Sequence, residues 1–271
     1  NQNVGIGNYV MDAAMDGAEG NVAIGYQTLS SLTTGDYNVA VGHQAGDSIV
    51  NAYGSTCIGY NAGAGVIANN GNTAIGYYAL RKEDDGDYNT AIGYLSMETI
   101  NYDASDGNTA IGYKALMGGT PAAASANNVA IGKEAMSSIT GGSSNVGIGA
   151  NAADALTTGS NNVAVGSGSL GAAAVGEAGN IAIGTGSMGS YDEGNGTVDY
   201  NISIGYYAFS GGDLASTGRT STNNIAIGTN ALNSTDDNAQ TGTIAIGASA
   251  LTALTSGAGN IAIGYNSMLG H

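Results

Sequence analysis

The residues of this chain that could bind a ligand lie between short apolar runs. Acidic residues gather at Asp84-Asp85-Gly86-Asp87, at Asp103 with Asp106, at Asp192-Glu193 and at Asp236-Asp237. Carboxylate oxygens are preferred ligands of Ca²⁺, but these clusters have neither EF-hand spacing nor that of a calcium-binding nonapeptide repeat. We therefore expect solvated loop carboxylates, and calcium would be structural where it bound. We expect no other cofactor.

Two glycine-rich stretches, GSGSLG at 166–171 and GTGSMG at 184–189, follow apolar runs and read GxGxxG. The dinucleotide fingerprint also needs a helix within a βαβ unit of ~30 residues. The next apolar runs open at Asn180 and Asn201, which leaves no room for that helix. We do not expect cofactor binding at either stretch.

The residue types that usually carry catalysis are scarce. His43 follows a recurring glycine where other copies have Tyr, Lys or Thr, and we expect a surface turn residue there. Cys57 is the only cysteine and takes the place of an alanine, so we expect a small buried side chain rather than a reactive thiol. The sequence predicts no catalytic residue, no metal site and no enzyme activity.

Tyrosine is the remaining signal, with sixteen Tyr beside one Phe and no Trp. Four tyrosines follow the recurring glycine in consecutive copies: Tyr60, Tyr77, Tyr94 and Tyr113. In register they would stack along one edge. Such a stack is either a stabilising ladder or a platform for the sugar rings of a host glycan, and the sequence leaves both interpretations open.

Insertions lengthen the loops at 118–127, 189–200 and 210–223. Insertions in repeat proteins map to one face and often carry binding. We therefore select as candidate receptor or glycan contacts Tyr191, Asp192, Glu193, Asp199, Tyr200 and Arg219.

All these residues are positioned by one repeated pentapeptide. It occurs fifteen times between Asn3 and Gly264, at spacings of 17 to 23 residues. Such a period predicts a parallel β-solenoid, in which each repeat buries its apolar face against its neighbours. We expect residues 1–271 to form a single repeat domain, a shaft. Because the first residue is Asn1 instead of Met and the first copy already begins at Asn3, we expect this shaft to be a segment of a longer chain.

Within the pentapeptide, positions two and four are β-branched, so they should share one packed face of a strand. Position three is never larger than Cys, which predicts close packing on the opposite face and a strand buried on both sides. Examples of the repeat residues are Asn21, Asn72, Asn89 and Asn108 at position one, Ile24, Ile75 and Ile92 at position four, and Gly25, Gly42, Gly59, Gly76, Gly93 and Gly112 at position five.

The glycine at position five fits a tight turn with positive φ or a close approach of backbone. A small and then a large residue follow, as in Ala79-Leu80, and should close the core as a second short strand or a helical turn. The asparagine at position one either forms a hydrogen-bonded ladder along the stack or simply favours a turn.

One repeat encloses little core by itself, so we expect a homotrimer with the position-three residues near the contact between subunits. Parallel stacking adds about 4.8 Å per repeat, which predicts a rod of roughly 65–70 Å. The net charge of −16 disfavours phosphate backbones and anionic lipid. The sequence has no apolar run long enough for a transmembrane helix. We expect no nucleic-acid partner and no membrane insertion.

The phrase Asn-Thr-Ala-Ile-Gly-Tyr-Xaa-Ala-Leu, seen in 72–80 and 108–116, resembles the repeat of bacteriophage tail-fibre proteins. It is also similar to the β-roll head of trimeric autotransporter adhesins. The resemblance implies a trimeric fibre at the virion surface or outside the cell, whose partners are other fibre or virion proteins and a glycan or protein receptor on the host. A bacterial adhesin head is the alternative.

Two further functions stay open. Thr56, Thr73, Thr90 and Thr109 align in consecutive copies, as in an ice-binding solenoid, although position two should be buried. A glycan-cleaving spike would need paired carboxylates on strands, whereas the acidic residues here lie in loops.

Overall fold

The computed structural model describes residues 2–82, 86–99, 105–119, 125–172, 176–190, 197–211, 220–233, 240–254 and 257–269. The chain divides into two compact units, residues 1–134 and 135–271, and each is described by itself. The described residues of both units form short strands and turns without a helix. None of these residues therefore belongs to a helix that could cross a membrane.

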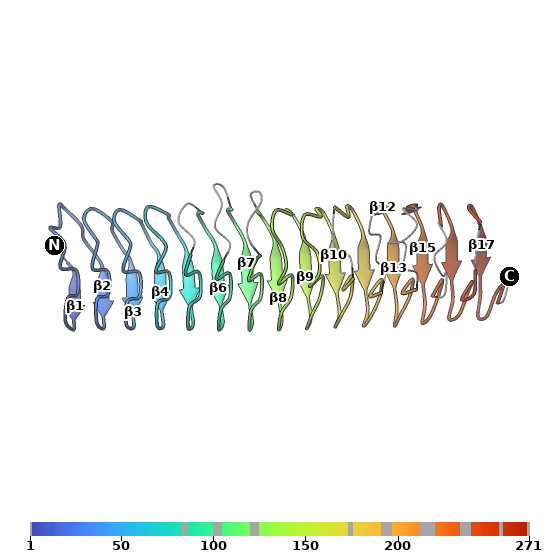
Figure 1. Cartoon of the computed structure of the whole chain (residues 1–271), viewed down its shortest axis with the longest axis horizontal. Coiled ribbons are helices and arrows are strands. Elements are labelled where there is room, and N and C mark those ends of the chain that lie inside the picture. The colour runs from blue at the N-terminus through green and yellow to red at the C-terminus, as the bar shows by residue number, and fades with distance from the viewer. Residues whose placement is uncertain are drawn as a thin grey trace. The chain divides into compact units, whose positions relative to one another are not determined.

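The first unit is a parallel β-solenoid in which each pentapeptide supplies one strand. The strands pair in chain order, residue for residue, so that Thr56 faces Thr73 and Ile58 faces Ile75. Each strand and the residues that follow it make one coil (Figure 1). The strands are β1 (Val4–Ile6), β2 (Val22–Ile24), β3 (Val39–Val41), β4 (Thr56–Ile58), β5 (Thr73–Ile75), β6 (Thr90–Ile92), β7 (Thr109–Ile111) and β8 (Val129–Ile131).

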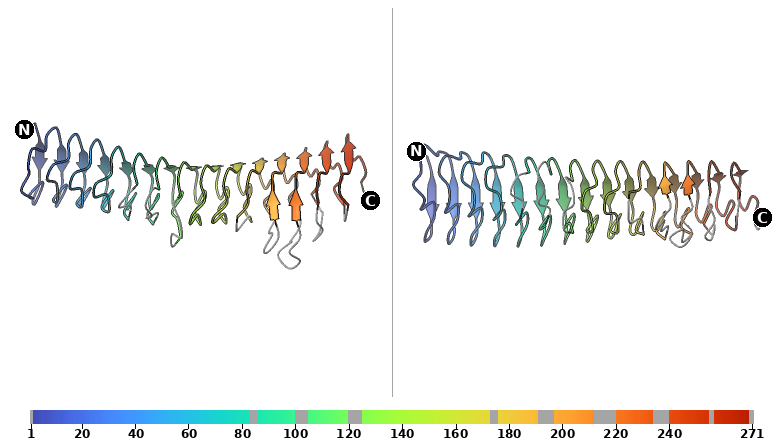
Figure 2. Two further views of the ribbon diagram at one scale, coloured as in Figure 1. Left: turned by 90° about the horizontal axis from the view of Figure 1, so that it is seen from above. Right: turned by 45° about the horizontal axis from the view of Figure 1, so that its top comes forward.

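The second unit repeats this architecture and adds a second, short sheet. Its main strands are β9 (Val146–Ile148), β10 (Val163–Val165), β11 (Ile181–Ile183), β13 (Ile202–Ile204), β15 (Ile225–Ile227), β16 (Ile244–Ile246) and β17 (Ile261–Ile263). Strands β12 (Thr197–Asp199) and β14 (Thr220–Thr222) pair in parallel with each other. Figure 2 shows them as short arrows apart from the main sheet, on the loop side of their coils. The predicted parallel β-solenoid is confirmed in each unit.

The core of each coil lies on the position-three side of the strand. Position-three residues such as Ala40 and Ala74 are buried completely. The large residue of the small–large pair packs directly on them: a Cβ added to Gly147, at position three, would lie 2.8 Å from the Met136 side chain. This contact explains why position three stays small.

Positions two and four point outward, which corrects the expectation that the strand is buried on both sides. Thr73 and Ile75 are half-buried, and Ile58 is 37% exposed. The expected place of position three at a contact between subunits is therefore wrong. Because alternate residues of a strand face opposite ways, filling the interior with alanine puts the β-branched residues outside. One chain also encloses a substantial core, with Leu29, Leu32 and further Leu, Met and Ile side chains buried completely.

The small–large pair lies in neither the strand nor the helical turn that the sequence suggested. Ala79 and Leu80 are both buried, but Tyr78 and Leu80 have φ of 56° and 52°, on either side of Ala79. Left-handed residues thus alternate with ordinary ones through the bend. The same pair of positions is left-handed in the other coils, for example at Gln27 and Leu29. A non-glycine residue in this region costs about 1–2 kcal/mol, so the buried core must stabilise the bend.

The glycine at position five satisfies both predicted reasons for its presence. Gly76 has a φ of +137°, and a Cβ there would lie 2.4 Å from the carbonyl oxygen of Gly93 in the next coil. The predicted repeat glycines Gly25, Gly42, Gly59, Gly93 and Gly112 have the same left-handed backbone and the same close neighbour. Stacked coils meet here backbone to backbone, and no side chain fits between them.

The asparagine at position one forms the ladder that was one of its two predicted roles. The Oδ1 atom of Asn38 accepts the backbone N–H of Ser55 at 2.9 Å, and its Nδ2 atom donates to the carbonyl of Ala52 at 2.7 Å. Asn108 likewise accepts the N–H of Asn128 at 3.0 Å. The members Asn21, Asn72, Asn89 and Asn108 are buried completely, so the ladder satisfies backbone groups inside the coil.

Candidate functional site

An aromatic column runs along the first unit at the residue that follows the repeat glycine. The ring centroids of Tyr60 and Tyr77 lie 5.2 Å apart, those of Tyr77 and Tyr94 5.1 Å, and those of Tyr94 and Tyr113 5.7 Å. The ring planes are within 14° of parallel. This spacing follows the distance between paired strands, and it confirms the predicted stack.

His43 extends this column, which sequence reasoning missed. Its ring lies 5.0 Å from that of Tyr26 and 5.0 Å from that of Tyr60, and it is stacked on both. His43 follows Gly42 in the same way as the tyrosines follow their glycines, so the shared place in the repeat was the available signal. We call Tyr26, His43, Tyr60, Tyr77, Tyr94 and Tyr113 the aromatic column.

The column presents ring surface to solvent beside two cations. Its tyrosines are 40–47% exposed. The Arg81 guanidinium lies 4.4 Å from the ring centroid of Tyr78, which contacts Tyr77, and the Lys114 ammonium lies 5.4 Å from that of Tyr113. A side-chain hydrogen bond with Tyr78 is the largest cause that raises the pKa of Tyr77 above its ordinary value. The phenol of Tyr77 is therefore neutral at physiological pH. The exposed rings of the column suit partners that carry no charge and partners that bind aromatic side chains.

The loop residues selected as receptor contacts are only partly described. Tyr191, Asp192, Glu193 and Arg219 lie outside the described residues. The other two do not form a site with each other. The Asp199 Oδ1 atom accepts the backbone N–H of Ala178 at 2.7 Å, and Tyr200 is 62% exposed with its ring against Gly179.

The acidic residues that are described hold the backbone of neighbouring coils. The Oδ1 atom of Asp87 accepts the N–H of Asn70, and the Oδ1 atom of Asp106 accepts the N–H of Asp87. The remaining members of the four acidic clusters lie outside the described ranges. Among the residues that the structure does describe, no three His, Cys, Asp or Glu side chains converge as metal ligands. The calcium hypothesis gains no support from Asp87 or Asp106.

Cys57 is buried, as predicted, and its neighbour accounts for its size. A Cβ added to Gly63 would lie 2.4 Å from the Cys57 Sγ atom. The extra volume of sulfur at position three is thus matched by a glycine where most coils have a large residue. Burial raises the pKa of the Cys57 thiol from 9.0 to about 12, so the group is protonated and unreactive at neutral pH.

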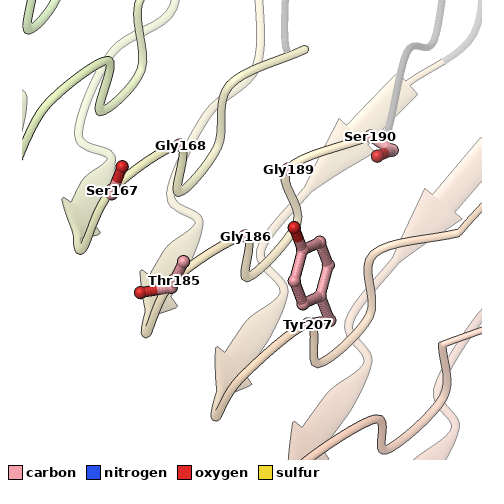
Figure 3. A pocket seen from close by; sticks show the side chains of 7 residues that line it. All are labelled: Ser167, Gly168, Thr185, Gly186, Gly189, Ser190 and Tyr207. Atoms are coloured by element: carbon pink, nitrogen blue, oxygen red, sulfur yellow. The ribbon is translucent and has the colours of Figure 1, made fainter.

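The two GxGxxG stretches line a pocket of about 270 Å³ in the second unit (Figure 3). Its residues are three with hydroxyl side chains, three glycines and one tyrosine: Ser167, Thr185, Ser190, Gly168, Gly186, Gly189 and Tyr207. Sequence reasoning excluded a dinucleotide here and did not foresee another use of these glycines. A signal was present, because the second residue after the repeat glycine is itself glycine only at Gly168 and Gly186.

The fold and these surfaces define a repeat protein of the parallel β-solenoid class. Comparisons with protein-family models, with curated proteins and with solved structures find no match to this chain.

Proposed function

We propose that this chain belongs to the shaft of a bacteriophage tail fibre, which lies at the virion surface and contacts the host cell. It acts by shape and by repeated weak contacts, without catalysis. Three features support the proposal: the likeness of segments 72–80 and 108–116 to the tail-fibre repeat, the solenoid architecture of each unit, and the exposed rows of side chains.

The single observation that carries a structural role is the outward sheet face. In the first unit, the half-buried and exposed side chains at positions two and four form two rows of Val, Thr and Ile across paired strands, for example Thr73 beside Thr90 and Ile75 beside Ile92. A sheet face in contact with water usually carries polar residues, and a large exposed apolar surface marks an interaction site. We therefore assign self-association, as a homotrimer, to this outward face instead of to position three.

Host contact is assigned to the aromatic column. Its rings are stacked on one another, so each offers an exposed edge in successive coils, and a polymeric glycan could engage several edges at once. Linked weak contacts of this kind raise avidity without new chemistry.

Cell adsorption tests this function. The labelled protein is incubated with host cells, and the variant Tyr77→Ser/Tyr94→Ser is compared with Tyr53→Ser, an exposed tyrosine outside the column. The proposal is supported if the double variant no longer binds host cells while the control variant still does. Equal adsorption of both variants, or release of fragments from host polysaccharide, contradicts it.

A bacterial trimeric adhesin head fits the same fold and outward face. The complete coding sequence separates the two, because an adhesin requires a membrane anchor and a fibre requires virion-attachment segments.

The outward face favours one second function, ice binding. Thr56, Thr73, Thr90 and Thr109 pair directly across β4 to β7 and are half-buried instead of buried. This removes the objection that position two is buried, whereas the row is still bounded by Val39 in β3 and Val129 in β8. A thermal hysteresis measurement tests it, and solutions that freeze without hysteresis exclude it.

A further inference from the structure

We propose that the pocket between the coils of β10, β11 and β13 binds one neutral sugar ring. This inference rests on the proposed function, since it names the chemical class of a host-surface ligand. It concerns a place separate from the aromatic column, in the second unit.

The pocket exists because two successive coils lack a side chain. The second residue after the repeat glycine is Asn151 one coil earlier and Tyr207 one coil later, but it is Gly168 and Gly186 in between. A Cβ on Gly168 would meet no heavy atom within 4 Å. The space above Gly168 is therefore open, and it accounts for part of the cavity of about 270 Å³.

Tyr207 forms a fixed aromatic wall. Its ring lies against Gly186, where an added Cβ would be 2.7 Å from a ring carbon. The ring of Tyr206 contacts the Tyr207 ring edge to face, with 4.6 Å between the ring centroids. The backbone N–H of Tyr207 donates to the carbonyl of Thr185 at 3.0 Å. Figure 3 shows the Tyr207 hydroxyl directed toward Gly189 and Ser190. One face of an otherwise polar pocket is thus held in place before a ligand arrives.

The other lining groups are hydroxyls. Ser167, Thr185 and Ser190 are exposed, and within the described part of the chain no hydrogen bond occupies their side chains. A hydroxyl both donates and accepts, so these three can pair with the hydroxyls of a ligand in either direction.

Charge and size select the ligand class. Among the described residues that line the pocket no side chain is charged, and the chain carries a net charge of −16, which disfavours anions. An aromatic face attracts the weakly positive C–H groups of a saturated ring, while Ser and Thr suit its hydroxyls. The cavity volume of about 270 Å³ lies just below the ~300–1,000 Å³ of sites for drug-sized molecules, which fits a ligand as small as one pyranose ring. A neutral monosaccharide unit, such as the end of a host glycan, meets all three conditions.

Saturation-transfer NMR with glucose, galactose, N-acetylglucosamine and the anionic N-acetylneuraminic acid tests the proposal on the full chain. We expect millimolar binding of at least one neutral sugar, as is usual for weak single-site ligands. The variant Gly168→Asn should fill the pocket and weaken this binding about tenfold or more. It should still fold, because Gly168 has a φ of +62° and Asn151 adopts 56° at the same place one coil earlier.

The matched control is Ser249→Asn, the same position in a coil without the pocket, where φ is 55°. It should bind as the unmodified protein does, whereas Tyr207→Asn should lose binding. No binding of the three neutral sugars at up to about 50 mM, binding of only the anionic sugar, or equal binding by Gly168→Asn would overturn the proposal. If Gly168→Asn binds no sugar in solution but adsorbs to host cells normally, the pocket is not the host contact, while the fibre function stands. If the unmodified protein neither adsorbs to host cells nor associates with itself, that result would instead contradict the fibre function.

Discussion

At the scale of single residues, Asn38 shows how the solenoid satisfies its own backbone. Its side chain pairs with one N–H and one carbonyl, both buried. Asn38→Ala leaves these two groups without partners, at about 1–3 kcal/mol each. We expect the free energy of unfolding to fall by roughly 2–5 kcal/mol, measured by denaturant titration.

The chain itself supplies the control for this prediction. Ser55 stands at the same position and donates from its hydroxyl to the carbonyl of Asn69 at 3.3 Å. Asn38→Ser should therefore keep one of the two bonds and lose less stability than Asn38→Ala. Equal losses in the two variants would show that the ladder contributes little.

Cys57 gives a pH-dependent prediction. Its thiol loses a proton near pH 9 in the unfolded chain but near pH 12 when folded, as burial is the cause of its raised pKa. Above pH 9 the unfolded chain therefore binds fewer protons than the folded chain. Stability should fall by about 1 kcal/mol per pH unit between pH 9 and 12.

The measurement compares urea unfolding of the unmodified protein and Cys57→Ala at pH 8.5 and near pH 10.5, in the window set by the two pKa values. Tyrosine titration is common to both proteins, and alanine is the usual residue at this position. The difference in stability between them should shrink or reverse in favour of Cys57→Ala at the higher pH. A difference that does not change with pH would contradict a buried thiol, as would rapid thiol labelling of the native protein at neutral pH.

The limits of sequence reasoning are visible at the same scale. The identity of Gly76 and Asn38 as repeat positions follows from periodicity, since one backbone requirement recurs in every coil. Which side of the strand is the inside does not follow, because alternation is symmetric and alanine fits either a narrow core or a tight contact with another chain. His43 was missed because its type differs from Tyr while its place does not. The pocket was missed because it depends on absent side chains in two neighbouring coils.

At the scale of elements, the bend after each strand sets the stability of a coil. Gly76 has a φ of +137°. A Cβ added there would lie 2.4 Å from the carbonyl oxygen of Gly93 in the next coil. Gly76→Ala should therefore force neighbouring coils apart and cost more than about 3 kcal/mol, the range of strained backbone with steric overlap. Thermal unfolding followed by circular dichroism measures this loss.

Gly54→Ala is the matched control for the bend. Gly54 also has positive φ, +66°, but an added Cβ meets nothing within 4 Å. The free energy of unfolding of Gly54→Ala should fall only by the cost of a non-glycine residue at positive φ, about 1–2 kcal/mol. If both variants unfold at the same temperature, close stacking at position five is not what requires glycine.

The backbone conformation of the bend could not be predicted from its residue types. Leu29, Tyr78 and Leu80 are poor candidates for left-handed backbone, yet all have positive φ. Their local preference is overridden because the alternating bend delivers Leu29 and Leu80 into the core. Local propensity therefore misled where the periodic pattern did not.

For the molecule as a whole, we propose that the outward sheet face of β-branched residues is covered by further copies of the chain. Ile75→Lys puts a charge on that face without entering the core, because Ile75 points outward. We expect this variant to fold and to remain monomeric at concentrations where the unmodified protein assembles. Tyr53→Lys, at an exposed loop residue, should assemble normally.

Sedimentation equilibrium of the unmodified protein measures whether this face associates. We predict a single species with three times the chain mass of 26.5 kDa. A folded protein that stays at 26.5 kDa over the full concentration range would contradict it.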